Sequence, residues 1–372
     1  MGAGMIPYGH HTIEDDDVQA VTEALRSGQI VQGPVVKGFE SDLAGYCKID
    51  HVVAVSSGTA ALHAALVAYG IRDGQNVIVP AITFAATAGA VLAVKANPIF
   101  VDVDQEKLHI DPARIAQILR RGSAKVSAVI AVDYGGQPCD YEALRQVLDH
   151  APGGRKVVLI ADAAHSFGAR IAGRPACRAA DLACFSFHPV KTITTGEGGA
   201  IVTDFPEIAR RARAFRDHGR DQGVAYTAGL NYRMSELHAA LGRSQLRKAG
   251  RFLVRRWEIA EKYSYCFRDV PGVSTPPSHY NNDSAWHLFV VRVEAKKRNA
   301  FRAALADRGV GTQVHYRPVY DHPVYSQWRT DCPVADREAA RVVSLPIYPG
   351  MTDKEVEHVI DSVRAVAKVV LT

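Results

Sequence analysis

The sequence lacks the short motifs that identify several common enzyme classes. No GxGxxG run follows an apolar segment and no GxSxG run is present, which argues against a nicotinamide-dependent dehydrogenase and a serine hydrolase. The histidines show no HExxH pattern or paired ligand spacing, so we predict no metal site. The six cysteines form no CxxC pair, which in a chain of 372 residues indicates free thiols in a reducing, cytoplasmic compartment.

Excess charge and long apolar runs are also scarce. Lys and Arg number 44 and Asp and Glu number 39, and the net charge of +5 is too small to predict a nucleic-acid partner by itself. The first residues lack the basic and apolar regions of a secretory signal, so we expect none. Residues 76–94 carry no charge, but Pro80, Thr83 and Gly89 interrupt them. This pattern predicts a buried strand followed by a helix, and no membrane partner.

The sequence does contain a series of short apolar segments that alternate with helical patterns. Such segments are typical of strands buried on both faces of a sheet. A first helix is predicted over residues 14–27, where Thr12 and Asp15 form a capping-box pattern and Val18, Val21 and Leu25 share an apolar face. We predict an α/β fold with a mostly parallel central sheet and helices on both faces. The predicted strands are residues 52–56, 77–80, 99–103, 126–132, 157–161, 182–187 and 200–203.

The pattern changes in the last third of the chain. Residues 234–267 form a long helical pattern without proline, and residues 274–278 are rich in Ser and Pro. Beyond them, strands are predicted over 287–293 and 312–316, and helices over 296–308 and 353–368. We therefore predict a large domain over residues 1–250 and a smaller C-terminal α+β domain over residues 251–372.

Polar side chains follow several of the predicted strands. Ligands of parallel sheets bind beyond the carboxyl ends of the strands, so these residues are candidates for a site. Gly58 and Thr59 open a helix after a strand, which suits a phosphate or marks an ordinary capped helix. Asp162 follows the apolar residues 157–161 and either caps the next helix or binds a protonated ring nitrogen. Lys191 follows a buried strand, where loss of its proton would make it a nucleophile for carbonyl groups.

Together these three features indicate one cofactor. A phosphate turn, a strand-end aspartate and a strand-end lysine supply what pyridoxal phosphate needs, namely a cradle for its phosphate, a partner for its ring nitrogen and a Schiff-base lysine. The pair Trp286 and His287 could border this site or pack in the core.

The sequence also resembles a known family. The resemblance extends from Tyr8 to Pro349 and is carried by the runs SSGTAAL, PAITFAATA, FVDVD, DAAHSFGA, CFSFHPVKTITTGEGGAIVTD, HGR and LNYRMSELHAALGRSQL. These are similar to the DegT/DnrJ/EryC1/StrS sugar aminotransferases, which have the fold type I of pyridoxal phosphate-dependent transferases. The runs GGQPCD, HPVKTITTGEGG and QVHYRPVY are most similar to transaminases of pseudaminic acid biosynthesis. That similarity implies transfer of the amino group of L-glutamate to C4 of a UDP-linked 4-keto-6-deoxy-N-acetylhexosamine.

The resemblance implies roles at matching positions. Lys191, Asp162 and His165 would be the catalytic residues, with Lys191 in a Schiff base with pyridoxal 5'-phosphate and Asp162 on the ring nitrogen. Phe84 would stack on the ring, and Asn231 would reach the cofactor phosphate of the partner subunit in a homodimer with shared sites. The cofactor phosphate would be lined by Gly58, Thr59, Ala60 and Ser186. An N-terminal arm of residues 1–30 would contribute to the substrate site, and the sugar nucleotide would contact Tyr8, Gly28, Gln29, Ile30, Val31, Gly58, Ser186, Asn231, His315, Tyr316, Arg317 and Pro318.

Other functions stay open on the sequence. An aminotransferase acting at C3, or on a GDP- or dTDP-linked keto sugar, would share the lysine run. A sugar dehydratase of the same family would carry histidine in place of Lys191. A non-catalytic regulator that binds pyridoxal phosphate would need neither Lys191 nor Asp162.

Overall fold

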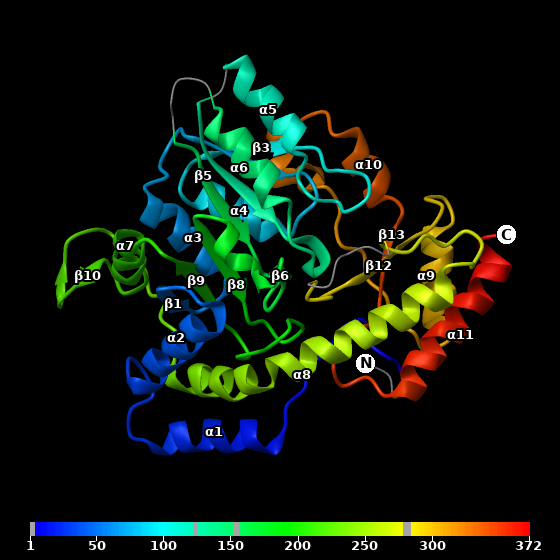
Figure 1. The fold of residues 1–372 in the computed structure, drawn as a ribbon, viewed down its shortest axis with the longest axis horizontal. Helices are drawn as coiled ribbons and strands as arrows, with labels where there is room; N and C mark the ends of the chain where they lie inside the picture. Colours follow the sequence, from blue (N-terminus) through cyan, green and yellow to red (C-terminus); the bar gives the residue numbers. More distant parts are fainter. Residues whose placement is uncertain (1–3, 123–124, 152–155, 278–283) are drawn as a thin grey trace.

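A seven-stranded sheet forms the centre of the computed structural model, which describes residues 4–122, 125–151, 156–277 and 284–372 (Figure 1). Strand β9 (Gly199–Thr203) is antiparallel to both of its neighbours, whereas the other neighbouring strands pair in parallel. The prediction of a mostly parallel α/β sheet is therefore confirmed. The strand order is β1 (His51–Val55), β9, β8 (Leu182–Ser186), β5 (Val158–Asp162), β4 (Val126–Val132), β2 (Asn76–Pro80) and β3 (Asn97–Val101).

Helices cover both faces of this sheet because alternate side chains of each strand point to opposite sides. Val53 and Val55 of β1 belong to one buried cluster, and Val52 and Ala54 belong to another. The first cluster includes α3 (Gly58–Tyr69), α4 (Ala85–Ala93) and α7 (Pro206–Arg216), and the second includes α2 (Pro34–Cys47), α5 (Pro112–Arg121) and α6 (Tyr141–Asp149). Residues 76–94, uncharged in sequence, are accordingly strand β2 and helix α4 between buried surfaces. Within the described ranges, no helix combines the length and the apolar character needed to cross a membrane.

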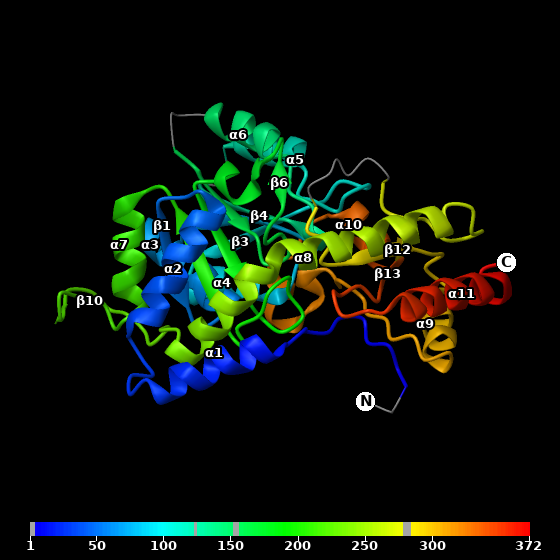
Figure 2. The same ribbon diagram turned by 60° about the horizontal axis from the view of Figure 1, so that its bottom comes forward.

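A third cluster lies at the other end of helix α8 (Glu236–Phe267), which runs from the sheet to the C-terminal elements in both views (Figures 1 and 2). It is built on the antiparallel pair β12 (Phe289–Arg292) and β13 (Val342–Leu345) together with α9 (Arg298–Asp307) and α11 (Asp353–Val370). Residue 250 lies inside α8, and the division of the chain at that residue stays a prediction. Apart from the first helix, the remaining elements are α10 (Pro333–Ala339), the hairpins β6 (Arg170–Ile171)–β7 (Arg174–Pro175) and β10 (Arg220–Asp221)–β11 (Val224–Ala225), and short 3-10 turns.

Two local predictions are wrong. Residues 312–316 form no strand, since only Gln313 pairs with Ser344 in a single bridge. The first helix, α1 (Asp15–Arg26), is present, but Asp17 rather than Asp15 accepts the hydrogen bond of the capping box, from the backbone N–H of Glu14 at 2.9 Å. Its apolar face also points away from the chain, because Val18 and Leu25 are 57% and 60% exposed.

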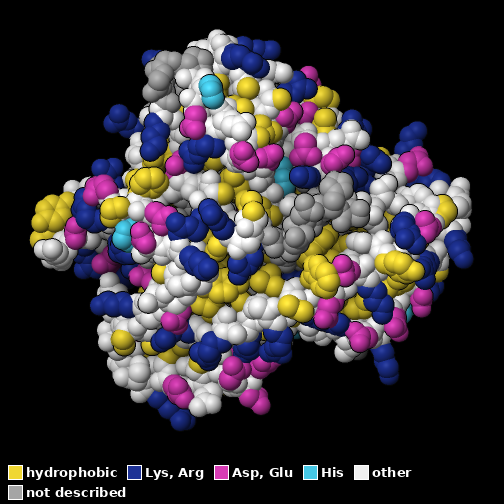
Figure 3. Space-filling view, in the orientation of Figure 1, with side chains coloured by type: hydrophobic (Ala, Val, Ile, Leu, Met, Phe, Trp, Pro, Cys, Tyr) yellow, Lys and Arg dark blue, Asp and Glu magenta, His cyan; other side chains and the backbone are white. Residues whose placement is uncertain are grey.

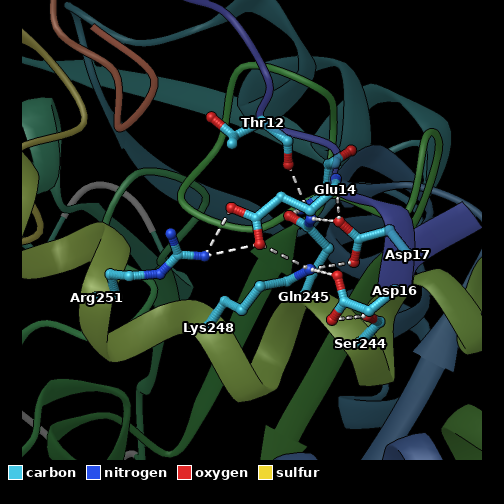
Figure 4. A network of polar contacts seen from close by, with 9 residues as sticks. Thr12, Glu14, Asp16, Asp17, Ser244, Gln245, Lys248 and Arg251 are labelled. Atoms are coloured by element: carbon cyan, nitrogen blue, oxygen red, sulfur yellow. Dashed lines mark hydrogen bonds and ion pairs between the residues drawn. The ribbon is translucent and has the colours of Figure 1, made fainter. Parts of the chain in front are cut away.

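Helix α1 is docked on α8 by its acidic side (Figure 4). Lys248 Nζ lies 2.6 Å from Asp16 Oδ1 and 2.8 Å from Asp17 Oδ1. Asp17 is fully buried, and its Oδ2 accepts a hydrogen bond from Gln245 Nε2 at 2.8 Å. Arg251 makes two further contacts with Glu14 at the surface. Charge and hydrogen bonding, rather than apolar burial, therefore hold the helix that leads into residues 28–31.

Replacement of Lys248 by methionine is expected to loosen α1. The change leaves the buried Asp17 carboxylate without its cation, and breaking such a buried pair costs about 3 kcal/mol. Amide hydrogen exchange over residues 15–26 should speed up correspondingly. The matched control is Arg251→Met, which removes an exposed pair and should change the opening free energy by less than about 1 kcal/mol. Equal exchange in the two variants would contradict this account of the docking.

Candidate functional site

Lys191 and Asp162 are brought together at the carboxyl ends of two neighbouring strands, β8 and β5. Beyond β8 the chain turns back into β9, and the turn is fixed by hydrogen bonds from Phe187 N to Gly198 O and from Thr195 N to Phe187 O. The backbone N–H of Lys191 donates to His188 O at 2.9 Å within this turn. The sheet therefore positions the lysine on a short, well-bonded segment.

Asp162 is the last residue of β5 and is 5% exposed. Its Oδ2 accepts a hydrogen bond from Thr87 Oγ1 at 2.7 Å, and its Oδ1 accepts one from Ala164 N at 3.3 Å. Burial raises the pKa of this carboxyl group, whereas its hydrogen bonds and the nearby Lys191 oppose the rise. A cationic partner would keep the carboxylate ionised, as the ring nitrogen of pyridoxal phosphate would.

The amine of Lys191 lies among nitrogen groups. Its Nζ is 3.4 Å from Nε2 of His287, a histidine that is 4% exposed. Burial lowers the pKa of Lys191 to about 8; the charge of Asp162 raises it and that of Arg256 lowers it further. The amine therefore loses its proton far more readily near neutral pH than an ordinary lysine with a pKa of 10.5, as a Schiff-base lysine requires.

Aromatic side chains form the wall beside this pair. His165 Nε2 lies 3.1 Å from the hydroxyl of Tyr316, and the ring of Tyr316 lies 6.0 Å from that of Phe84. His315 precedes Tyr316 in the chain, and its ring lies 5.3 Å from that of Tyr8. Phe84 is 59% exposed, which leaves its ring available to a bound partner.

The start of α3 forms a cradle next to Ser186. The Ser57 hydroxyl caps the helix by accepting from Ala60 N, while the amides of Gly58 and Thr59 have no partner within the helix. A Cβ atom on Gly58 would lie 2.7 Å from Ser186 Cβ, so only glycine allows this approach of α3 to β8. Helix amides beside a hydroxyl suit a phosphate. The cradle, the buried carboxylate and the lysine of lowered pKa together fit pyridoxal 5'-phosphate.

The other residues predicted to contact the substrate or the cofactor are bonded to parts of the chain other than Lys191. Asn231 is exposed and pairs with Asp217 in a single bridge, and Arg317 is also exposed, whereas Pro318 is buried. Ile30 and Val31 are 47% and 50% exposed and are tied to the start of α8, through Ile30 O to Glu236 N and the bridge of Val31 with Ser235. Gly28 has a positive φ of 79°, and Gln29 donates to Gln32 O. Among the described residues, no hydrogen bond or ring contact joins these to Lys191.

Two residues at the site were not identified from the sequence. Thr87 donates to Asp162, and its spacing of four from Thr83 in the run ITFAATA was the available signal. Arg256 is fully buried in α8 although it is charged. It lies at helical spacing from Phe252, Ile259 and Tyr263, so an arginine in the apolar stripe of the long helix could have indicated a buried role.

Comparisons with known proteins identify the family of the chain. A sequence profile of the DegT/DnrJ/EryC1/StrS aminotransferase family matches residues 11–364. The chain is 36% identical over 385 residues to the spore coat polysaccharide biosynthesis protein SpsC of Bacillus subtilis, covering 98% of this chain and 97% of that protein. PseC of Helicobacter pylori, an aminotransferase involved in the biosynthesis of pseudoaminic acid, has a TM-score of 0.93 at 27% identity, covering 98% of this chain and 100% of that one. The PLP form of the putative sugar aminotransferase Spr1654 of Streptococcus pneumoniae has a TM-score of 0.92 at 28% identity, covering 99% and 100%.

Proposed function

The chain belongs to the DegT/DnrJ/EryC1/StrS aminotransferase family and is a pyridoxal phosphate-dependent sugar aminotransferase, and from this premise we propose that it transfers the amino group of L-glutamate to C4 of a UDP-linked 4-keto-6-deoxy-N-acetylhexosamine. The observation that carries the proposal is the approach of the Lys191 amine and the Asp162 carboxylate at neighbouring strand ends, beside the Gly58 cradle. This site would serve both the donor and the acceptor.

The residues of the chain would divide the work as follows. When bound, pyridoxal phosphate supplies an electron-poor ring that takes up the electron pair released at the reacting carbon. Asp162 would hold the ring nitrogen protonated, and the amides of Gly58 and Thr59 with the Ser186 hydroxyl would hold the phosphate. Lys191 Nζ would remove the proton from the α-carbon of glutamate and later return a proton at C4 of the sugar. His165, with the Tyr316 hydroxyl on its Nε2, would border the ring.

The sugar specificity is supported by two observations. The structural neighbour PseC is described as an enzyme of pseudoaminic acid biosynthesis. The segment His315-Tyr316, which we expect to contact the sugar nucleotide, packs against His165 and Tyr8. Other sugar aminotransferases are similar to the chain to the same degree, so an acceptor with another nucleotide or a C3 keto group is the second candidate.

Product analysis by NMR tests the substrate. The chain is incubated with L-glutamate and a panel of UDP-, GDP- and dTDP-linked 4-keto and 3-keto sugars. We expect a new amine at C4 of the UDP-linked sugar only. Amination of another panel member instead would replace the proposed acceptor, whereas the absence of any absorbance change on adding glutamate would point to a non-catalytic regulator.

We further propose a cytoplasmic homodimer in which each subunit completes the site of the other. The segment from hairpin β10–β11 to Asn231 exposes apolar side chains. Val224, Tyr226 and Leu230 are 52%, 72% and 42% exposed. Figure 3 shows hydrophobic side chains at the left edge, over the hairpin β10–β11. Together with the outward apolar face of α1, these surfaces support a second copy of the chain as their cover.

Mixing two inactive variants tests the shared sites. Lys191→Ala and Asn231→Ala are purified separately, unfolded together and refolded, so that about half of the dimers are mixed. A mixed dimer has one site with both Lys191 and Asn231 intact, so activity should return to about a quarter of the wild-type level. No recovery from a dimeric mixture would show that Asn231 serves its own subunit.

A further inference from the structure

His287 is the buried group closest to the reacting lysine that the proposed function does not use. It lies just before β12, in the C-terminal part of the chain, whereas Lys191 lies beyond β8. The two side chains meet with 3.4 Å between Lys191 Nζ and His287 Nε2. The His287 ring also lies 4.4 Å from that of His165. A histidine from another part of the chain therefore contacts the catalytic amine directly.

The other ring nitrogen of His287 determines which way the hydrogen bond runs. Nδ1 of His287 is buried and has no hydrogen-bond partner among the described residues. A neutral imidazole carries one N–H, and a buried N–H without an acceptor is costly. The proton is therefore placed on Nε2, where a partner exists. An Nε2–H can only donate, and the lysine can accept only through the lone pair of its uncharged amine.

Arg256 bonds to the backbone at both His287 and the residue next to Lys191. Its guanidinium donates to the backbone carbonyl of His287 at 3.4 Å and to that of Val190, next to Lys191, at 3.5 Å. Two further bonds reach the carbonyls of Trp286 and Ile347. Among the described residues no carboxylate forms an ion pair with Arg256. The positive charge of Arg256 lowers the pKa of Lys191. Arg256 is thus a positioning residue for the histidine and the lysine together.

We propose that His287 is a further catalytic residue, whose Nε2–H donates a hydrogen bond to the lone pair of the free Lys191 amine and so holds the lysine in the uncharged form that can act as a base. The inference rests on the proposed role of Lys191. It adds that the lysine has a defined partner in the part of the cycle in which it is released from the cofactor.

The other groups around Lys191 agree with a neutral donor. Burial holds the pKa values of His287 and His165 well below their usual range and lowers that of His315 to about 3, so these histidines stay uncharged at neutral pH. Asp162 is the acidic group that favours the charged lysine, and Arg256 opposes it. Donation from His287 adds to the side of the uncharged amine.

The test measures the titration of Lys191 in the full-length, cofactor-free chain. Acetic anhydride modifies only the uncharged amine, and mass spectrometry of the Lys191 peptide gives the midpoint, expected near pH 8 for the wild type. His287→Phe keeps the site buried but removes the donor, which should move the midpoint up by about one pH unit. His287→Gln can restore a donor and should return the midpoint toward the wild-type value. The matched control is His63→Phe, which alters a half-buried histidine bonded to Tyr232 elsewhere in the chain and should leave the midpoint unchanged.

Each outcome decides the proposal. An unchanged midpoint in His287→Phe would show that burial alone sets the titration of Lys191. A lower midpoint would show that His287 accepts rather than donates, and either result overturns the proposal.

In the holoenzyme, His287→Phe should slow the conversion of the bound cofactor by glutamate about tenfold at pH 7. The rate should recover above pH 9, where the lysine is uncharged without help. If the variant does not fold, NMR of ring-labelled histidine in the wild type should show the Nε2–H form of His287, and the Nδ1–H form would refute it. A wild type that ignores glutamate would instead refute the proposed function.

Discussion

Replacement of Lys191 by alanine is expected to lower kcat for amino transfer by roughly four orders of magnitude. Burial lowers the pKa of this amine to about 8, and Lys191 is the lysine whose charge acts on the Asp162 carboxyl group. The variant should also lose the absorbance of the Schiff base. Stopped-flow absorbance with glutamate and steady-state assays with the keto sugar measure both effects.

Two comparisons separate this chemical loss from a structural one. Lys125→Ala removes an exposed lysine immediately before β4 and should leave kcat unchanged. Added methylamine should restore part of the proton transfer in Lys191→Ala, because a small amine can occupy the space of the missing side chain and act as the base. If Lys191→Ala kept more than a tenth of wild-type turnover, Lys191 would not be the catalytic lysine.

Replacement of Asp162 by asparagine is expected to lower kcat by about 10³, the size of effect seen when one preorganised electrostatic group is removed. Asparagine keeps the shape of the side chain and can still accept the hydrogen bond of Thr87, but it has no charge to hold a proton on the ring nitrogen. The affinity for pyridoxal phosphate should fall as well. Equilibrium dialysis and single-turnover rates measure the two effects separately.

Asp133 provides the matched control for Asp162. It is also a buried carboxylate, with burial raising its pKa to about 6, but its oxygens accept bonds from Ser166, Tyr141 and Cys139 N. Asp133→Asn should change stability with little effect on single-turnover rates. A similar fall in rate in both variants would indicate that a buried negative charge near the sheet edge, rather than the position of Asp162, is what the reaction needs.

The sheet was predictable because each strand can be recognised from its own residues. Segments such as residues 157–161 are apolar at every position, and this requires cover on both faces whatever the rest of the chain does. Lys191 and Asp162 could be proposed for the same reason, since Asp162 comes directly after one such segment and Lys191 comes shortly after another. The site could thus be outlined from residues whose position depends on one neighbouring element.

The features that the sequence did not predict, or predicted only in part, depend on contacts between distant elements. The pattern of residues 14–27 indicated a helix with one apolar face but not how it docks, because the bonds of Asp17 to Lys248 and Gln245 turn the acidic face toward α8. Residues 312–316 alternate as a strand would, yet Tyr316 packs against His165 and Phe84 at the site. Arg256 and His287 meet Lys191 from 65 and 96 residues away along the chain, and no local pattern contains that pairing.

Helix α8 restricts where the chain can be joined to that of a relative in a chimaera. Within about five turns it presents Gln245 and Lys248 to α1, Arg256 to the Lys191 turn and Tyr263 to the C-terminal cluster. One inserted residue would rotate everything beyond it by about 100° and advance it by about 1.5 Å. Chimaeras that exchange the C-terminal portion to alter acceptor choice should therefore be joined within α8 without gain or loss of a residue, and the donor sequence should bring its own arginine at the position of Arg256.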